Sequence, residues 1–286
     1  MKYVIKDNEA AFVSKNGCFE KMLTAGTYHF SRLLGYEVEI EEMAGEMDYL
    51  ETPYQVLARD DTFSASTIHR EIPDGSVGFI YVNGKLTSFA NRKEYTFWNV
   101  YDKYEIKVVS MEEVVMGTGI TKQMLSLIPG KYYTEVLVGE GETGLVYFDN
   151  ILQKPLPKGV YRFWNYRFSI TSLVIDMRQK ELDISGQEIL TKDKIGIRMN
   201  VACLYKIRDA VDFVTTVSDL KGQLYVAVQL AIREIVGNYK LDEILEGKER
   251  ISAELYGALK DREGMFCVNF LTAGIKDIIL PGEIRE

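Results

Sequence analysis

The chain has 286 residues, 47% hydrophobic and 27% charged, which gives ample core material and a length that allows one to three domains. Its formal net charge is -8, from 34 basic and 42 acidic residues. This balance argues against a general nucleic-acid binder, because phosphate contacts need clustered basic side chains, and it disfavours a polybasic contact with anionic lipid.

The N-terminal half repeats a β-rich pattern three times. A Tyr-x-Phe strand recurs at intervals of 67 and 66 residues, at Tyr28–Phe30, Tyr95–Phe97 and Tyr161–Phe163. Each copy also has a short polar turn of the kind that joins two strands of a hairpin, at Asn16-Gly17, Asn83-Gly84 and Asp149-Asn150. A nearly constant period of this length predicts internal repeats.

Each copy then has a strand that ends in a methionine, a short crossing segment and a further strand. The crossing segments are Tyr54–Leu57, Lys122–Leu125 and Gln187–Leu190. In the third copy, residues 174–193 predict a strand, a turn at Ser185-Gly186, the crossing segment and a polar turn. Apolar residues then alternate with polar ones over 195–201, which predicts a half-buried strand.

Helical periodicity begins only after the third β unit. Residues 209–216 predict a short helical turn, and a long helix from Ser218 should end at Gly237-Asn238. A short turn at 241–245 and a second long helix from about Gly247 follow, with Glu263-Gly264 as its end. Phe266, Val268 and Phe270 alternate into a returning strand. Strands, then helices, then a strand predict an α+β fold.

The stretch from Asp176 to Asp193 resembles the signature of the stomatin/slipin branch of the SPFH (band-seven, prohibitin-like) family. The resemblance covers roughly residues 138–286, and it departs from the family at Ser185-Gly186, where a proline-containing turn is typical. The residues that carry it are Asp176, Met177, Arg178, Gln187, Glu188, Ile189, Leu190, Thr191, Lys192, Asp193, Ile275, Lys276, Asp277 and Pro281.

The resemblance implies an SPFH domain over 138–286, with a mixed β-layer and packed helices. We expect two further β-rich units that resemble this β-layer, at 1–70 and 71–137, as in bacterial slipin variants with a soluble N-terminal extension. In the family a long Ala- and Glu-rich coiled-coil helix follows. Residues 282–286 resemble the start of that helix, so we expect the chain to be a piece of a longer protein.

No catalytic residue, metal site or cofactor is expected. The glycines of residues 139–144 match a phosphate-binding pattern, but they lead into a strand and include two acids, so they predict a turn. The two histidines, His29 and His69, lie in or beside strands. Three separated cysteines predict reduced structural thiols and no zinc site: Cys18, Cys203 and Cys267.

The resemblance implies a non-enzymatic scaffold that organises membrane-associated assemblies or regulates a membrane protease through oligomerisation. Partners would be further copies of the chain, a membrane protease or other membrane protein, and lipid in a peripheral contact on the cytoplasmic side. No secretory signal starts the chain, and no apolar run approaches the roughly 20 residues that span a bilayer. A subunit contact is expected at Leu220, Leu224, Val228, Ile235, Ile251 and Leu255.

Two alternatives stay open from the sequence. The first is a purely cytosolic protein-binding module, favoured by the acidic balance and the lack of a membrane hairpin. The second is an enzyme hidden in the N-terminal repeats, for which residues 59–70 are the nearest candidate, although they predict only a turn and a strand.

Overall fold

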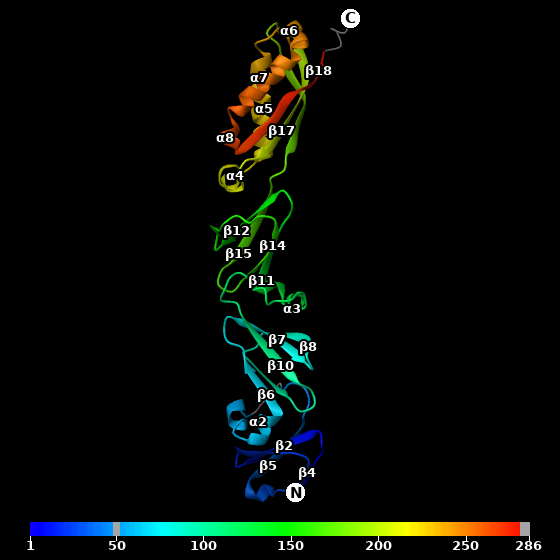
Figure 1. Ribbon diagram of the computed structural model, residues 1–286, viewed down its shortest axis with the longest axis vertical. Helices are drawn as coiled ribbons and strands as arrows, with labels where there is room; N and C mark the ends of the chain where they lie inside the picture. Colours follow the sequence, from blue (N-terminus) through cyan, green and yellow to red (C-terminus); the bar gives the residue numbers. More distant parts are fainter. Residues whose placement is uncertain (48–51, 281–286) are drawn as a thin grey trace. The chain divides into compact units, whose positions relative to one another are not determined.

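The computed structural model describes residues 1–47 and 52–280 (Figure 1). The chain divides into two compact units. One unit comprises Met1–Thr134 with Arg162–Phe168, and the other comprises Glu135–Tyr161 with Ser169–Glu286. The chain is α+β, as expected. Residue 70, expected to end the first β unit, lies inside a strand, so a boundary at that point would cut a strand pair.

The N-terminal and central parts of the chain contain three antiparallel sheets of three strands. The first, in the order β3-β2-β5, consists of Cys18–Leu23, Glu9–Lys15 and Tyr36–Glu42. The second, in the order β8-β7-β10, consists of Lys85–Ala90, Ser76–Val82 and Tyr104–Ser110. The third, in the order β13-β12-β15, consists of Ile151–Leu152, Glu142–Phe148 and Ile170–Asp176.

A two-stranded antiparallel pair accompanies the first sheet and another the second, and a further two-stranded sheet accompanies the third. These are β1 (Lys2–Ile5) with β4 (Gly26–His29), β6 (Thr67–Glu71) with β9 (Glu94–Trp98), and β11 (Tyr133–Val138) with β14 (Gly159–Trp164). The hairpin turns predicted from sequence are present. Both residues of each turn have positive φ, at Asn16-Gly17, Asn83-Gly84 and Asp149-Asn150.

Short helical segments connect these strands: η1 (Arg32–Leu34), α1 (Tyr54–Leu57), α2 (Asp61–Ser66), α3 (Lys122–Leu127) and η2 (Gly130–Tyr132). The Asp60 side chain caps α2, and the Thr121 hydroxyl caps α3. Residues 59–70 therefore hold a helix before their strand, which corrects the expected turn. The first two crossing segments are likewise helical.

The C-terminal sheet has the order β16-β17-β18 and is formed by Lys180–Leu190, Gly196–Ile207 and Val268–Ile279. The turn predicted at Ser185-Gly186 is wrong. Strand β16 runs through these residues with a β-bulge, so the third crossing segment is its second half. Gly186 has φ of 67°, and its backbone N–H donates to Asn200 Oδ1 at 2.7 Å, which lets both halves of β16 pair with β17.

The helices between β17 and β18 are α4 (Ala210–Thr216), α5 (Leu220–Val236), α6 (Leu241–Glu246), α7 (Lys248–Lys260) and α8 (Glu263–Phe266). Asp219 caps α5, one residue after the predicted start. Glu263 and Gly264 do not end the second long helix but begin α8. Cys267 then has φ of 53° and turns the chain into β18.

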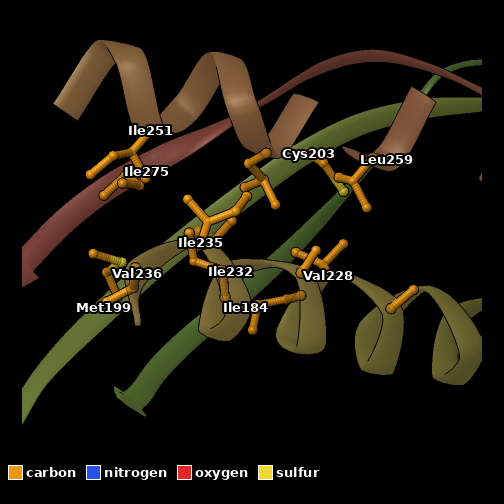
Figure 2. Close-up of a cluster of buried hydrophobic side chains, with 14 of the residues drawn as sticks. Ile184, Met199, Cys203, Val228, Ile232, Ile235, Val236, Ile251, Leu259 and Ile275 are labelled. Atoms are coloured by element: carbon orange, nitrogen blue, oxygen red, sulfur yellow. The ribbon is translucent and has the colours of Figure 1, made fainter. Parts of the chain in front are cut away.

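One large core joins the C-terminal sheet to its helices. Helix α5 packs on β16, α7 packs on β18, and the two helices contact one another, so they cover the same face of the sheet. Figure 2 shows Ile184 and Met199 of the sheet among Val228, Ile232 and further side chains of the helices. Each fully buried aliphatic side chain of this kind contributes about 1.5–3 kcal/mol to folding.

The other unit has smaller cores. Phe63 of α2 is fully buried, and its ring lies 5.9–6.2 Å from the rings of Phe12, Tyr54 and Trp98. A separate cluster gathers around Phe79, Met124 and Trp164. No helix in residues 1–47 and 52–280 is long and apolar enough to cross a membrane.

Candidate functional site

The signature begins with an ion pair at the end of β15. The Arg178 guanidinium donates from Nε and Nη2 to the two Asp176 carboxylate oxygens, at 2.8 and 3.1 Å. These hydrogen bonds, with the Arg178 backbone N–H, lower the pKa of Asp176 to about 2. The Met177 backbone N–H donates to the carbonyl of Gly141, at 2.9 Å. The pair therefore secures the chain where it leaves the third β-sheet.

Gly141 makes this close approach feasible. Its φ is 72°, and a Cβ at this position would lie 2.7 Å from Arg178 Cγ. The glycine-rich residues 139–144 form a turn that leads into β12, and no helix follows, as the sequence predicted. Gly141 admits the arginine side chain, and the turn leads into a strand, whereas a phosphate-binding loop leads into a helix N-terminus.

Gln187 connects the sheet to helix α5. Its side chain is 6% exposed, and its amide nitrogen donates to the Tyr225 hydroxyl at 3.0 Å. Its amide oxygen accepts from Gln229. Tyr225 and Gln229 lie one helical turn apart, so one buried amide is held by two successive turns of α5. Sequence reasoning missed both partners.

Thr191 and Asp193 hold the β16–β17 turn against α6. The Thr191 hydroxyl donates to Asp193 Oδ1 at 2.5 Å and accepts from the Ile195 backbone N–H at 3.0 Å. The same carboxylate oxygen accepts from the backbone N–H of Leu241, the first residue of α6, at 3.2 Å. These hydrogen bonds, the one from Thr191 above all, lower the pKa of Asp193. Lys192 joins the contact through its backbone N–H, which donates to Tyr239 O at 2.8 Å.

The remaining signature residues alternate across the sheet. Ile189 and Ile275 are buried in the core, whereas Leu190 is 60% exposed. On the opposite face, Arg198 donates to Glu188, at 2.9 Å from Nε and 2.6 Å from Nη2, and Lys276 donates to Asp183 at 2.9 Å. Asp277 is exposed opposite Asn200, and Pro281 lies outside the described residues.

A groove of about 570 Å³ lies at one end of the C-terminal sheet. It is lined by Glu188, Ile189, Leu190, Gly196, Ile197, Arg198, Ile279 and Leu280. The Glu188–Arg198 ion pair and the exposed Leu190 give it a mixed charged and apolar lining. Its described lining residues include no cluster of acids, bases and nucleophiles of the kind that indicates catalysis.

The expected subunit contact needs a correction. Five of its six side chains are buried within this chain: Leu224, Val228, Ile235, Ile251 and Leu255. Leu220 is partly buried against the same core. The helical stripe that predicted this contact is the face that packs on the sheet, so the five buried side chains are not accessible to another copy.

The cysteines and histidines do not assemble a catalytic site in the part of the chain that the structure describes. Cys203 and Cys267 are buried, and Cys18 is exposed. Burial raises the pKa of the Cys203 thiol to about 11, which keeps it protonated at neutral pH. His29 is exposed in β4, and His69 lies in β6.

Comparison with known proteins identifies the family. Residues 136–286, more than half of the chain, match the SPFH domain / Band 7 family. Stomatin-like protein 3 of Mus musculus is 28% identical over 112 residues, which are 39% of each chain. A stomatin homologue of Pyrococcus horikoshii is 25% identical over 115 residues, 40% of this chain and 43% of the relative.

Stomatin of Mus musculus is 27% identical over 112 residues, again 39% of each chain. The chain thus spans about two fifths of the length of these curated relatives. The match includes the turn at Gly141, the Asp176–Arg178 pair, the Gln187 contacts and the Thr191–Asp193 turn. This chain belongs to the SPFH/Band 7 family, on its stomatin branch.

Proposed function

We propose that the protein is a non-enzymatic scaffold that self-associates and organises membrane-associated protein assemblies, of which a membrane protease is one candidate client. Membership of the SPFH family supports a scaffold role. The observation that carries the proposal is that the signature side chains contact other parts of the fold. Asp176, Gln187, Thr191 and Asp193 all make contacts that hold the turn, the sheet and the helices in place.

The three similar sheets support a repeated docking platform. In each, a central strand pairs antiparallel with a hairpin partner on one side and a later strand on the other, as in β3-β2-β5. We propose that β1–β5 and β6–β10 are copies of the β-layer of the SPFH domain. They would present additional strand faces to partner proteins.

The exposed side of α5 is the better candidate for a contact between copies. Val226 and Leu230 are 51% and 55% exposed, and Met265 of α8 is 68% exposed. They border a groove of about 830 Å³, whose rim carries acidic Glu234 and basic Arg262. A rim of both signs suits a contact between two identical surfaces, because each copy offers a partner to both charges of the other.

Sedimentation velocity over a range of concentrations tests self-association. The chain should form oligomers, and the double variant Val226→Ser/Leu230→Ser should shift them to monomer. Leu33→Ser is the matched control, because Leu33 is 99% exposed and belongs to the other compact unit. A chain that stays monomeric, or a control that dissociates it equally, would contradict the contact.

Flotation with liposomes of bacterial lipid composition, at low and moderate salt, tests the membrane part of the proposal. Flotation that resists salt indicates apolar contact with the bilayer. Loss of flotation with salt indicates electrostatic adhesion, which the net charge of -8 disfavours. If the chain does not float at all, its direct contact with lipid is excluded. The second candidate function, a binding module without membrane contact, then gains support.

A further inference from the structure

Three side chains of metal-binding type lie together on the β6–β9 strand pair. In its antiparallel register, His69 lies opposite Thr96, and Glu71 lies opposite Glu94. Side chains alternate between faces along a strand, so these four share one face. One ligand atom from each of His69, Glu71 and Glu94 lies within 4.8 Å of the other two.

In the described part of the chain, no lysine or arginine forms an ion pair with either of the two carboxylates, Glu71 or Glu94. Like charges directly opposite one another on a strand pair destabilise the pair. Glu94 Oε2 lies 3.7 Å from His69 Nε2, which is too far for a hydrogen bond.

The imidazole of His69 is oriented toward these acids and is only partly satisfied. Its side chain is 11% exposed. Nδ1 lies 2.9 Å from the Thr96 hydroxyl oxygen, and the ring stacks on Tyr54 with centroids 3.8 Å apart. Nε2 is the single buried side-chain nitrogen or oxygen without a hydrogen-bond partner in the described part of the chain. A buried polar atom of this kind costs free energy unless a ligand or a hydrogen-bond partner satisfies it.

We propose that His69, Glu71 and Glu94 bind one divalent transition-metal cation of the zinc type. Imidazole with carboxylates suits Zn²⁺, whereas Mg²⁺ and Ca²⁺ take oxygen ligands. Tetrahedral bonds of about 2.1 Å place two ligand atoms roughly 3.4 Å apart, so small side-chain rotations close the site. The Thr96 hydroxyl fixes the ring through Nδ1, as the outer partners of metal-bound histidines do.

Such a site would neutralise the opposed glutamates and leave a fourth coordination position for water or a partner's side chain. It does not depend on the scaffold function. It differs from the sequence-based expectation of no metal site, which considered the spacing of cysteines and histidines alone. Glu94 lies far from His69 in the sequence, and only strand pairing brings them together.

Calorimetric titration of ZnCl₂ into the whole 286-residue chain at neutral pH tests the site. All samples carry Cys18→Ser, because the exposed thiol of Cys18 would itself take up zinc. We expect one equivalent of zinc to bind to the parent chain. In His69→Gln and in Glu94→Gln the affinity should fall more than about 100-fold, because each variant loses a direct ligand. Loss of a residue that only hydrogen-bonds to a ligand already lowers metal affinity by about 10–100-fold. His29→Gln, which alters the other histidine, should bind as the parent does. MgCl₂ should bind far more weakly.

Co²⁺ provides a second measurement that a folding defect alone would not imitate. Its visible absorption on binding should indicate a site with nitrogen and oxygen ligands, and added Zn²⁺ should abolish it. Glu94 has a side chain that is 59% exposed, so Glu94→Gln should keep the circular dichroism spectrum of the parent. Absence of saturable binding by the parent would overturn the proposal. Stoichiometric binding that persists in both His69→Gln and Glu94→Gln would also overturn it.

Discussion

Two regions with the same sequence pattern fold differently in this chain. Lys122–Leu127 follows a methionine-ended strand and forms helix α3, capped by Thr121. Gln187–Leu190 also follows a methionine-ended strand in the sequence and is the second half of β16. The difference lies in the partner. Strand β17 is 12 residues long and pairs with the whole of β16, and α5 receives the Gln187 side chain.

Tertiary packing therefore decides whether a short apolar segment of this kind becomes a helix or a strand. A helix of one or two turns has little stability of its own, because helix nucleation is costly. Met124 of α3 is buried in a small cluster with Phe79 and Trp164, whereas Ile189 of β16 is part of the large C-terminal core. Substitutions in the two cores, at Gln187, at the bulge and at the β16–β17 turn test whether these surroundings differ in stability.

The largest expected effect comes from the C-terminal core. Leu255→Ala should lower the free energy of unfolding by about 2–5 kcal/mol, because Leu255 is fully buried between the sheet and α5. Far-ultraviolet circular dichroism reports mainly α5 and α7, whereas both tryptophans, Trp98 and Trp164, belong to the other unit. The dichroism midpoint should therefore shift more than the fluorescence midpoint.

Phe63→Ala is the matched control for this experiment, because Phe63 is buried beside Trp98. It should move the fluorescence midpoint in preference to the dichroism. If both variants shift the two signals equally, the two cores unfold together, and the contrast between them does not extend to stability.

The next effect concerns the link between β16 and α5. Gln187→Ala should cost about 1–3 kcal/mol, since it leaves Tyr225 and Gln229 without their buried partner. Chemical denaturation monitored by circular dichroism measures this loss. Gln123→Ala, which truncates an exposed glutamine of α3, is the control and should change stability little. Equal losses would mean that the amide contacts do not distinguish the strand from the helix.

The sequence alone predicted much of the architecture. The alternation over 195–201, the apolar stripe of α5 and the Asn-Gly-type turns were all correct, because they depend on local periodicity and on residues that tolerate positive φ. The bulge was missed, since a Ser-Gly pair is as typical of a turn as of a bulge. The contact residues of α5 were misjudged because an apolar stripe does not tell whether a sheet or a second copy covers it.

The signature positions were found by resemblance, but their contacts were not. Tyr225 and Gln229 lie 38 and 42 residues from Gln187, and no local pattern links them. The same holds for Asp193, whose carboxylate accepts a hydrogen bond from the backbone N–H of Leu241, 48 residues away. Long-range partners of polar side chains need the fold before they can be assigned.

A pair of glycine substitutions tests the bulge itself. Gly186→Ala should destabilise the chain by about 1 kcal/mol, because φ of 67° disfavours a Cβ even though the space beside it is open. Gly257→Ala, in the exposed interior of α7 with equally open space, should stabilise it by about 0.5–1 kcal/mol. Thermal unfolding of both variants gives the comparison. A stabilising Gly186→Ala would mean that the strand does not need its bulge.

The smallest expected effect is a pH dependence at the β16–β17 turn. Folding lowers the pKa of Asp193. Its carboxylate therefore contributes fully to stability above the ordinary aspartate pKa of about 3.9, and this contribution is lost as the pH falls through the pKa of the folded state. Asp193→Asn should therefore be less stable than the parent at neutral pH, and the gap should shrink below about pH 4. Asp176→Asn should also be less stable than the parent at neutral pH, and this difference in stability should keep shrinking down to a pH of about 2. A gap that stays constant with pH would contradict the ionic character of these contacts.

The unequal exposure of the three thiols has a practical consequence. Cys18 is exposed at the start of β3, whereas Cys203 and Cys267 are buried. A maleimide dye or spin label added to the native protein should thus attach at one position, without any engineered cysteine. The label would lie on the N-terminal β-sheet, where it could follow the arrival of a partner in real time.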